Sequence, residues 1–233
     1  MNVVITGGTQ GMGRAIAEVF AAEGANITLT ARTESDLKKT QEILALKFPA
    51  IKILTIVADL GKMDQVKELG RKIRETWKSV DLLVNNAGVF LVGNMMEEPE
   101  ENIQKMMSVN VMGPIRLTRA LYPALKTAAA PHVINICSVA SQKYFPGSGS
   151  YSVSKYALLG YTRALREEWK EENIKVTALL PGATWSRSWA DSGIDPSRIM
   201  QANDVAQAVK SIWEMPATAL VEELVLRPPL GDL

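Results

Sequence analysis

Short runs of β-branched and aliphatic residues alternate along the chain with longer segments whose apolar residues recur at helical spacing. Such alternation is typical of βαβ units, which build a mainly parallel sheet with helices on both faces. The pattern predicts an α/β fold with a doubly wound sheet of about seven parallel strands and ligand sites at the carboxyl ends of the strands. The expected strands are Asn2–Thr6, Asn26–Thr30, Ile51–Val57, Asp81–Asn85, His132–Cys137, Lys175–Leu180 and Val221–Leu226. The expected helices are Gly11–Glu23, Glu34–Lys47, Lys62–Trp77, Glu100–Ala128, Tyr151–Glu171 and Asn203–Trp213.

A glycine-rich stretch, Thr6 to Gly13, stands where the first expected strand turns into the first helix. Glycines at 7, 11 and 13 let the backbone turn tightly and approach a phosphate, and the helix N-terminus offers free N–H groups and a positive dipole end. The spacing G-x-x-x-G-x-G differs from the G-x-G-x-x-G fingerprint. A glycine-rich turn that binds nothing therefore stays open from this motif alone, but a pyrophosphate cradle in a Rossmann-type sheet is favoured.

The end of the second expected strand bears on the choice of nicotinamide cofactor. Sites for NAD commonly place Asp or Glu there to hold the ribose 2′-OH, whereas an Arg accommodates the 2′-phosphate of NADP. Here Ala31 takes the acidic position, Arg32 follows it, and Thr33 offers a hydroxyl. The alternative is that Arg32 is a solvated surface cation and that Glu34 or Asp36 contacts the ribose. Both acids are expected in the first turn of the next helix, where their negative charge interacts favourably with the positive end of the helix dipole. We therefore predict NADP(H).

Tyr151 and Lys155 open the fifth expected helix and, four residues apart, share one of its faces. A neighbouring ammonium favours the ionised form of a phenol, which suits a tyrosine to general acid/base work. Ser138 lies at the end of the preceding strand, where a doubly wound fold places its site. The chain also carries a second Tyr-x-x-x-Lys, Tyr122 with Lys126, at the far end of a helix with no strand-end serine just upstream. We interpret that pair as packing plus a surface lysine.

At this point the chain resembles the short-chain dehydrogenase/reductase family, as a compact member similar to NADP-dependent carbonyl and 3-oxoacyl reductases, and the resemblance covers nearly its whole length. The motifs that carry the resemblance are Thr6–Gly13, the pair Asp59-Leu60, the N-N-A-G stretch Asn85–Gly88, the helix residue Asn110, the triad Ser138, Tyr151 and Lys155, and Pro181-Gly182. Several ordered motifs at the right spacing make a chance likeness improbable.

The resemblance implies a mechanism. Tyr151 would exchange a proton with the carbonyl or alcohol oxygen, Ser138 would polarise that oxygen, Lys155 would assist the phenol and bind the nicotinamide ribose, and Asn110 would hold a water in a proton relay. Hydride would pass between cofactor and substrate, and the nicotinamide would supply the chemistry. The expected cofactor-binding residues are Gly7, Thr9, Gln10, Gly11, Met12, Gly13, Arg32, Thr33, Asp59, Leu60, Asn85, Ala87, Gly88, Tyr151, Lys155, Pro181, Gly182 and Thr184.

Composition narrows the remaining possibilities. The chain has 233 residues, a net charge of +1, one cysteine and one histidine. A net charge this small gives no reason to expect nucleic acid or a membrane as partner. One histidine and one cysteine do not support a metal site with soft ligands. A single cysteine fits a reducing compartment, so the cytoplasm is the expected location. We expect His132 at the surface and Cys137 buried. Residues 1–233 are expected to form one catalytic domain, with residues 183–201, including Trp185 and Trp189, as a short lid over the substrate.

The leading hypothesis is therefore an NADP(H)-dependent reductase or dehydrogenase that interconverts a small ketone or aldehyde and an alcohol. Two alternatives stay open. The first is a 3-oxoacyl-thioester reductase of the same family, for which a basic docking patch such as Arg116 and Arg119 would help. The second is a non-catalytic sensor that binds NADP(H) without turnover. The family resemblance also implies a homodimer or homotetramer, assembled through the helices of residues 100–128 and 151–171.

Overall fold

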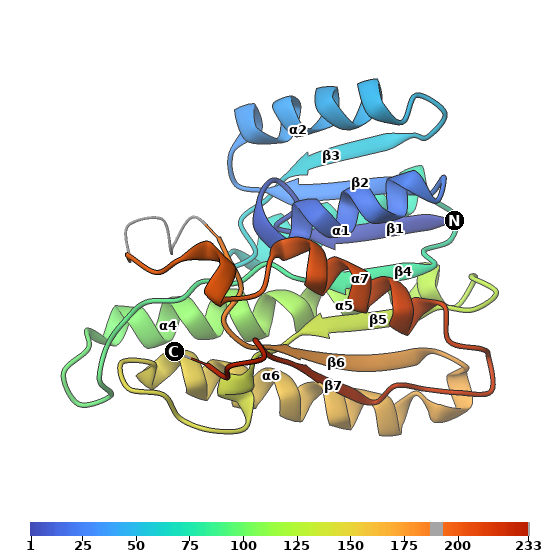
Figure 1. The fold of residues 1–233 in the computed structure, drawn as a ribbon. Coiled ribbons are helices and arrows are strands. Elements are labelled where there is room, and N and C mark those ends of the chain that lie inside the picture. The colour runs from blue at the N-terminus through green and yellow to red at the C-terminus, as the bar shows by residue number, and fades with distance from the viewer. Residues whose placement is uncertain (187–192, 233) are drawn as a thin grey trace.

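Seven parallel strands form one sheet, with the order β3-β2-β1-β4-β5-β6-β7, in a computed structural model that describes residues 1–186 and 193–232 (Figure 1). The expected α/β, doubly wound architecture is confirmed. The strands are β1 Asn2–Thr6, β2 Asn26–Ala31, β3 Ile53–Val57, β4 Leu82–Asn85, β5 His132–Ile136, β6 Lys175–Pro181 and β7 Glu223–Leu226. The longer helices are α1 Gly11–Ala22, α2 Glu34–Lys47, α3 Met63–Thr76, α4 Glu100–Met107, α5 Gly113–Leu125, α6 Gly149–Glu168 and α7 Ala202–Trp213.

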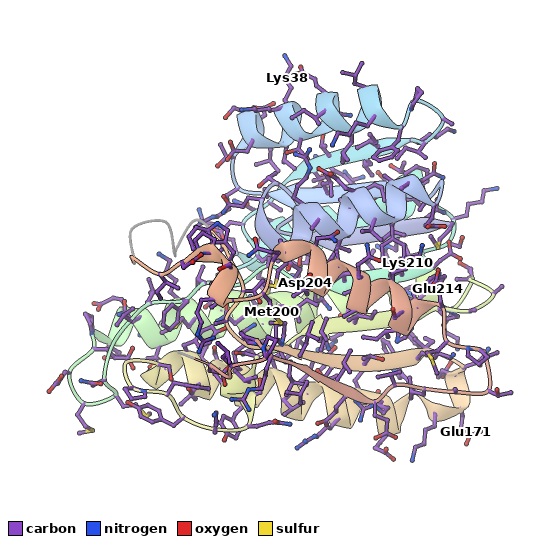
Figure 2. The ribbon with its side chains drawn as sticks, in the orientation of Figure 1. Lys38, Glu171, Met200, Asp204, Lys210 and Glu214 are labelled. Carbon is purple, nitrogen blue, oxygen red and sulfur yellow. The ribbon has the colours of Figure 1, made fainter. Side chains whose placement is uncertain are left out.

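Alternate residues of the central strands point to opposite faces, and both faces are covered. In β1, Val3 and Ile5 pack with α1, α2 and α7 on one face, whereas Val4 packs with α3, α5 and α6 on the other. This explains why the strands have apolar runs rather than an alternation of apolar and polar residues. Figure 1 shows α1 and α7 side by side. On α7, Lys210 pairs with Glu214, the residue after its own helix, and with Glu23, the residue after α1 (Figure 2).

The segment expected as one long helix, residues 100–128, is divided. A π-helical turn, η1 at Ser108–Met112, separates α4 from α5. Single π-helical turns widen a helix locally and are frequent at functional sites. Asn110 lies within this turn, and its side-chain amide exchanges two hydrogen bonds with the backbone of Val89, at 2.8 and 2.9 Å. The widened turn therefore serves to hold Asn110 against the loop that follows β4.

His132 is buried, with 2% of its surface exposed, so the expected surface position is wrong. β5 is hydrogen-bonded to β4 on one side and β6 on the other, and helices cover both of its faces, so even its first residue is enclosed. The imidazole Nε2 lies 2.8 Å from Thr177 Oγ1, and that hydroxyl donates its own proton to the carbonyl of Val221. Because the threonine proton is already used, Nε2 must carry the proton and donate it to Thr177.

His132 is expected to make stability depend on pH. Burial, with a smaller effect of Lys175, lowers the pKa of His132 to about 3, whereas an unfolded histidine titrates near 6.5. The unfolded state therefore gains a proton first, so the stability that neutral His132 contributes is present above about pH 6.5 and is lost as the pH falls toward 3. Between pH 7 and 5 this loss is about 1–2 kcal/mol.

His132→Gln keeps an N–H donor for Thr177 but cannot titrate. We expect urea unfolding at pH 7, 6 and 5 to show a smaller loss of stability for this variant than for the parent, by about 1–2 kcal/mol. Carboxylates elsewhere act equally on both proteins and cancel in the comparison. The same loss in both proteins would show that the buried imidazole does not contribute.

Within residues 1–186 and 193–232 no helix combines the length and the apolar character that a membrane crossing requires. In the same ranges no three side chains of His, Cys, Asp or Glu lie together as a metal site would need.

Candidate active site

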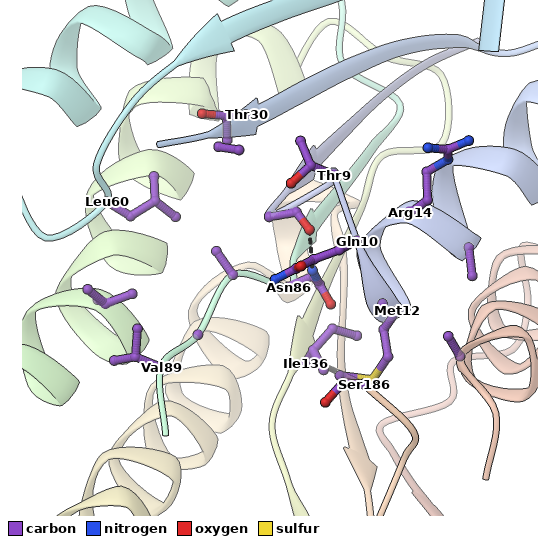
Figure 3. Close-up of a pocket in the computed structure, with 18 of the residues that line it drawn as sticks. Thr9, Gln10, Met12, Arg14, Thr30, Leu60, Asn86, Val89, Ile136 and Ser186 are labelled. Atoms are coloured by element: carbon purple, nitrogen blue, oxygen red, sulfur yellow. Dashed lines mark hydrogen bonds between the residues drawn. The ribbon is translucent and has the colours of Figure 1, made fainter. Parts of the chain in front are cut away.

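A cavity of about 1210 Å³ runs along the carboxyl ends of the strands (Figure 3). Its lining comes from the ends of β2 and β5, from the loops after β1, β2, β3, β4 and β6, from η1, and from α1, α2, α6 and α7. Small-molecule pockets commonly measure about 300–1,000 Å³. The cavity is therefore larger than a typical small-molecule pocket.

The turn between β1 and α1 forms one wall, and its glycines adopt conformations that other residues rarely take. Gly7 has φ +66° and Gly11 has φ +52°. The N–H of Gly7 donates to the carbonyl of Thr30 at 2.9 Å, which ties the turn to β2. Gln10 places no side-chain cap on α1, and the first turn has no acidic residue. The free N–H groups at this helix start are therefore available to an anion, as expected of a phosphate cradle.

Asn86 holds the glycine turn from the neighbouring strand. Its side-chain nitrogen donates to the carbonyls of Thr6, at 2.8 Å, and Gly7, at 3.2 Å. Figure 3 shows this side chain near the middle of the cavity lining. Asn86 was not among the expected site residues, although the N-N-A-G stretch contains it. The two asparagines of that stretch cannot be told apart without knowing which side each one faces.

Asn85 turns away from the cavity, into the core. Its side-chain nitrogen donates to Thr118 Oγ1 at 3.1 Å and Asn135 Oδ1 at 2.8 Å. Of the expected site residues, those outside the cavity lining are Gly13, Asn85, Asn110, Ser138, Pro181, Gly182 and Thr184. The others line the cavity, so the structure brings most of the expected set together around one space.

Gly13 is packed too closely for any side chain. A Cβ at this position would lie 2.3 Å from the carbonyl oxygen of Gly7 and 2.5 Å from Asn86 Nδ2. We expect Gly13→Ala to displace the glycine turn, to lower the free energy of unfolding by about 1–3 kcal/mol and to weaken nucleotide binding. Thermal unfolding and calorimetric titration with NADPH measure the two effects.

Gly160→Ala is the matched control. Gly160 lies within α6, and no atom lies within 4 Å of the position of its added Cβ. Because alanine favours helix over glycine, this change is expected to stabilise the protein by about 0.5–1 kcal/mol. If Gly13→Ala were as stable as Gly160→Ala and bound NADPH as well, the glycine turn would accommodate a side chain despite its close contacts.

The far end of the cavity is polar and charged. Arg32 and Thr33 line it from the β2–α2 connection, Asp36 from the first turn of α2, and Asp59 and Leu60 from the loop after β3. Arg32 is exposed, and none of the ion pairs found in residues 1–186 and 193–232 involves it. The guanidinium is therefore available to a ligand in this part of the cavity.

At the other end Lys155 links α6 to β5. Its side chain is buried, and Nζ donates to the carbonyl of Ile136 at 2.8 Å, two residues before Ser138. The same Nζ lies 5.7 Å from the ring centroid of Tyr151, so phenol and ammonium share one face of the helix as expected. Tyr151 and Lys155 both line the cavity, and neither points away from it.

Ser138 and Asn110 are the two expected catalytic residues that do not line the cavity. Ser138 follows β5 and begins a 3₁₀ turn, η2 at Val139–Ser141, where its Oγ accepts the N–H of Ala140 at 3.1 Å. A Cβ placed on Gly88 would lie 3.4 Å from Asn110 Oδ1 and 3.7 Å from Lys155 Nζ. The four expected catalytic residues thus come from three elements. Asn110 and Lys155 both lie beside Gly88, and Lys155 also bonds the end of β5.

Phe90 and Glu98 extend the site beyond the expected residues. Phe90 lines the cavity, and its ring meets the Tyr151 ring edge to face, with centroids 4.8 Å apart and planes at 75°. Glu98 Oε1 accepts the backbone N–H of Ser150 at 2.9 Å and its hydroxyl, at the start of α6. Ser148, the residue just before α6, supplies no side-chain cap of its own. The Glu98 carboxylate, 52 residues away in the sequence, therefore caps the start of α6.

The expected lid, residues 183–201, is described only in part, because residues 187–192, and Trp189 with them, lie outside the described ranges. Trp185 lines the cavity. Its N–H donates to the carbonyl of Met200 at 2.7 Å, and the N–H of Met200 donates to Ala183 at 3.1 Å. Met200 lies just before α7 (Figure 2). Both ends of the expected lid are therefore joined by backbone hydrogen bonds beside the cavity.

Comparisons with known proteins agree with this architecture. The family model of the short chain dehydrogenases matches residues 1–195. A sepiapterin reductase of Chlorobaculum tepidum is 32% identical over 99% of this chain and 97% of that protein. An alcohol dehydrogenase of Thermococcus sibiricus, solved with 5-hydroxy-NADP, has a TM-score of 0.90 at 27% identity, covering 100% of this chain and 98% of that one.

An L-sorbose reductase of Gluconobacter frateurii, solved with NADPH and L-sorbose, also has a TM-score of 0.90, at 26% identity over 97% of this chain and 95% of that chain. The family-model match covers well over half of the chain, and the sheet order and the joined cavity fit it. The chain belongs to the short-chain dehydrogenase family of oxidoreductases.

Proposed function

We propose that this protein is an NADP(H)-dependent oxidoreductase that interconverts a ketone or aldehyde and an alcohol, with Tyr151 as general acid/base. One observation carries the proposal. A single cavity joins the glycine turn and Arg32 at one end to Tyr151 and Lys155 at the other. A nucleotide sensor needs only the first end, whereas proton transfer to a substrate needs the second.

The residues present fit a dinucleotide that carries a 2′-phosphate. Uncapped N–H groups at the start of α1 suit the pyrophosphate, and Arg32 with Thr33 suits the 2′-phosphate, since a guanidinium can bind phosphate through two parallel hydrogen bonds. Asp59 and Leu60, which the family resemblance implies as the pair that contacts the adenine, also line the cavity. The solved relative from Thermococcus binds 5-hydroxy-NADP and the one from Gluconobacter binds NADPH, which supports the same choice here.

When bound, the nicotinamide supplies or accepts the hydride. The chain's own residues manage the proton and the oxygen. In reduction Tyr151 donates its phenolic proton to the carbonyl oxygen, and in oxidation it takes the proton of the alcohol. Ser138 donates a hydrogen bond to the same oxygen. Lys155 uses one N–H on the Ile136 carbonyl, which leaves two for the ribose and the phenol. Asn110, held by Val89, positions the proton relay.

The test follows NADPH oxidation with a panel of ketones, aldehydes and diketones. Turnover of at least one carbonyl by the parent, and its loss in Tyr151→Phe, is the expected result. A parent that binds NADPH but is as inert as the variant would instead indicate a redox sensor. Turnover confined to acyl-carrier or coenzyme A thioesters would indicate a 3-oxoacyl-thioester reductase.

The same proposal includes a single catalytic domain, a cytoplasmic location and a homodimer or homotetramer. Support for self-association comes from apolar side chains that are partly exposed on the helices expected to form the interface. Met112 is 36% exposed, Val153 on α6 is 36% exposed, and Tyr156 on the same helix is 47% exposed. Light scattering of the purified protein measures its mass, and a monomer at micromolar concentration would contradict the proposed assembly.

A further inference from the structure

The lining of the cavity is divided by charge. Its charged residues other than Lys155 are Arg14, Glu18, Arg32, Asp36 and Asp59. All of these come from α1, the β2–α2 region and the end of β3. The sheet order places β3, β2 and β1 together, on the opposite side of β4 from β5 and β6. Charge is therefore gathered in the half of the cavity proposed to hold the adenosine part of the cofactor.

The other half is uncharged apart from Lys155, and its polar side chains besides the reacting groups are Asn86, Ser186, Gln201 and Asn203. Its large side chains come from the loop after β4, the end of β5, the start of α6 and the loop after β6, and they are Val89, Phe90, Ile136, Cys137, Tyr151 and Trp185. Burial raises the pKa of the Cys137 thiol to about 11, so this group is neutral. Among the described lining residues in this half, Lys155 supplies the single charge, and its Nζ donates to the Ile136 carbonyl.

Phe90 gives this half a fixed apolar surface beside the phenol. Its ring packs edge to face on Tyr151 and is still 51% exposed, so one side of the ring remains open. The segment that follows Phe90 is tied to the start of α6. Gly93 donates to the carbonyl of Gly147 at 2.9 Å and accepts the N–H of Gly149 at 3.0 Å. Glu98 binds the Ser150 N–H and hydroxyl, so its carboxylate is engaged by the helix start.

We propose that the substrate carries an uncharged, apolar group of aromatic size next to its carbonyl, and that this group packs against Phe90 and Trp185. The inference rests on the proposed function, because it concerns the substrate of the same site. An aromatic group gains both apolar burial and a ring contact in such a place. A carboxylate would lose water there without a free cation among the described lining residues to replace it.

The test compares three probes with NADPH: benzaldehyde, 4-carboxybenzaldehyde and L-sorbose. The first two differ by one carboxylate, and L-sorbose represents a polyhydroxylated ketone. We expect kcat/KM for benzaldehyde to exceed each of the others by about tenfold or more. Phe90→Ala is expected to lower kcat/KM for benzaldehyde about tenfold, mainly through KM, with the affinity for NADPH unchanged.

Met96→Ala is the matched control, since Met96 lies on the same segment, is 95% exposed and does not line the cavity. It is expected to behave as the parent. Equal kcat/KM for the two aldehydes, a preference for L-sorbose, or an equal loss for all probes in Phe90→Ala would overturn the inference. Retained NADPH affinity and an unchanged melting temperature identify a Phe90→Ala protein that has folded.

The outcome separates this inference from the proposed function. If the parent reduces some of the probes and Tyr151→Phe reduces none, the function holds and the ranking of the probes decides the substrate class. If no probe is reduced although NADPH binds, the wider panel of ketones, aldehydes and diketones decides the proposed function. Calorimetric binding of benzaldehyde and 4-carboxybenzaldehyde to the complex with NADPH then still decides the inference. Preferential binding of benzaldehyde supports it, and equal binding of the two overturns it.

Discussion

Tyr151→Phe is expected to lower kcat by about 10²–10⁴-fold, the usual contribution of a positioned general acid or base. The substitution removes one oxygen atom and leaves the ring, so the edge-to-face contact with Phe90 is retained. The Lys155 hydrogen bond to the Ile136 carbonyl does not involve the phenol and is also retained. Fold stability and NADPH affinity should therefore be nearly unchanged. Steady-state kinetics on a reduced carbonyl, with NADPH titration by fluorescence, measures both quantities.

The chain supplies its own control for this experiment. Tyr122 with Lys126 has the same spacing, and Lys126 Nζ lies 5.4 Å from the Tyr122 ring centroid. The Tyr122 ring stacks on Trp169 at 5.1 Å, and neither Tyr122 nor Lys126 lines the cavity. Tyr122→Phe is expected to keep full activity. A similar loss of activity in both variants would contradict the assigned role of Tyr151, because Tyr122 has the same spacing to a lysine but lies outside the cavity.

The arrangement of the fold could be predicted because it depends on periodicity that is local in the chain. Each strand of the sheet overlaps an expected strand, and only their ends move, as when β3 begins at Ile53 rather than Ile51. The break in the helix expected over residues 100–128 depends instead on a contact that is distant in sequence. Asn110 forms hydrogen bonds with the backbone of Val89, and the spacing of apolar residues in a helix does not identify such a partner.

The same reason explains the errors and omissions in the candidate site. His132 was expected at the surface because it follows Ala-Ala-Ala-Pro at the start of a strand, but the neighbouring strands bury it and Thr177 bonds its ring. Glu98 was not singled out because its role is to cap a helix that begins far along the chain. Motifs find residues whose neighbours in sequence are also neighbours in space, and Tyr151 with Lys155 is such a case.

Replacing Arg32 with alanine is expected to weaken NADPH binding by about 10–100-fold and to leave NADH binding unchanged. The expected magnitude follows from losing charge-assisted hydrogen bonds to one phosphate, each worth about 1.5–3 kcal/mol, at a solvent-exposed position where the lower values apply. Arg32 lines the cavity and is exposed. Isothermal titration with each cofactor measures the change directly and requires no turnover.

Lys38→Ala is the matched control, because Lys38 lies on α2 near the same end of the cavity but is exposed on its outer side and does not line it (Figure 2). Loss of a general positive field would weaken NADPH binding equally in both variants, whereas a direct phosphate contact affects only Arg32→Ala. Salt separates the two cases further, since exposed charges are screened within about 8 Å at physiological ionic strength. Added salt should reduce the preference of the parent for NADPH over NADH. In Arg32→Ala the two cofactors should bind with nearly the same affinity at every salt concentration, and a large remaining preference for NADPH would place the 2′-phosphate on other residues.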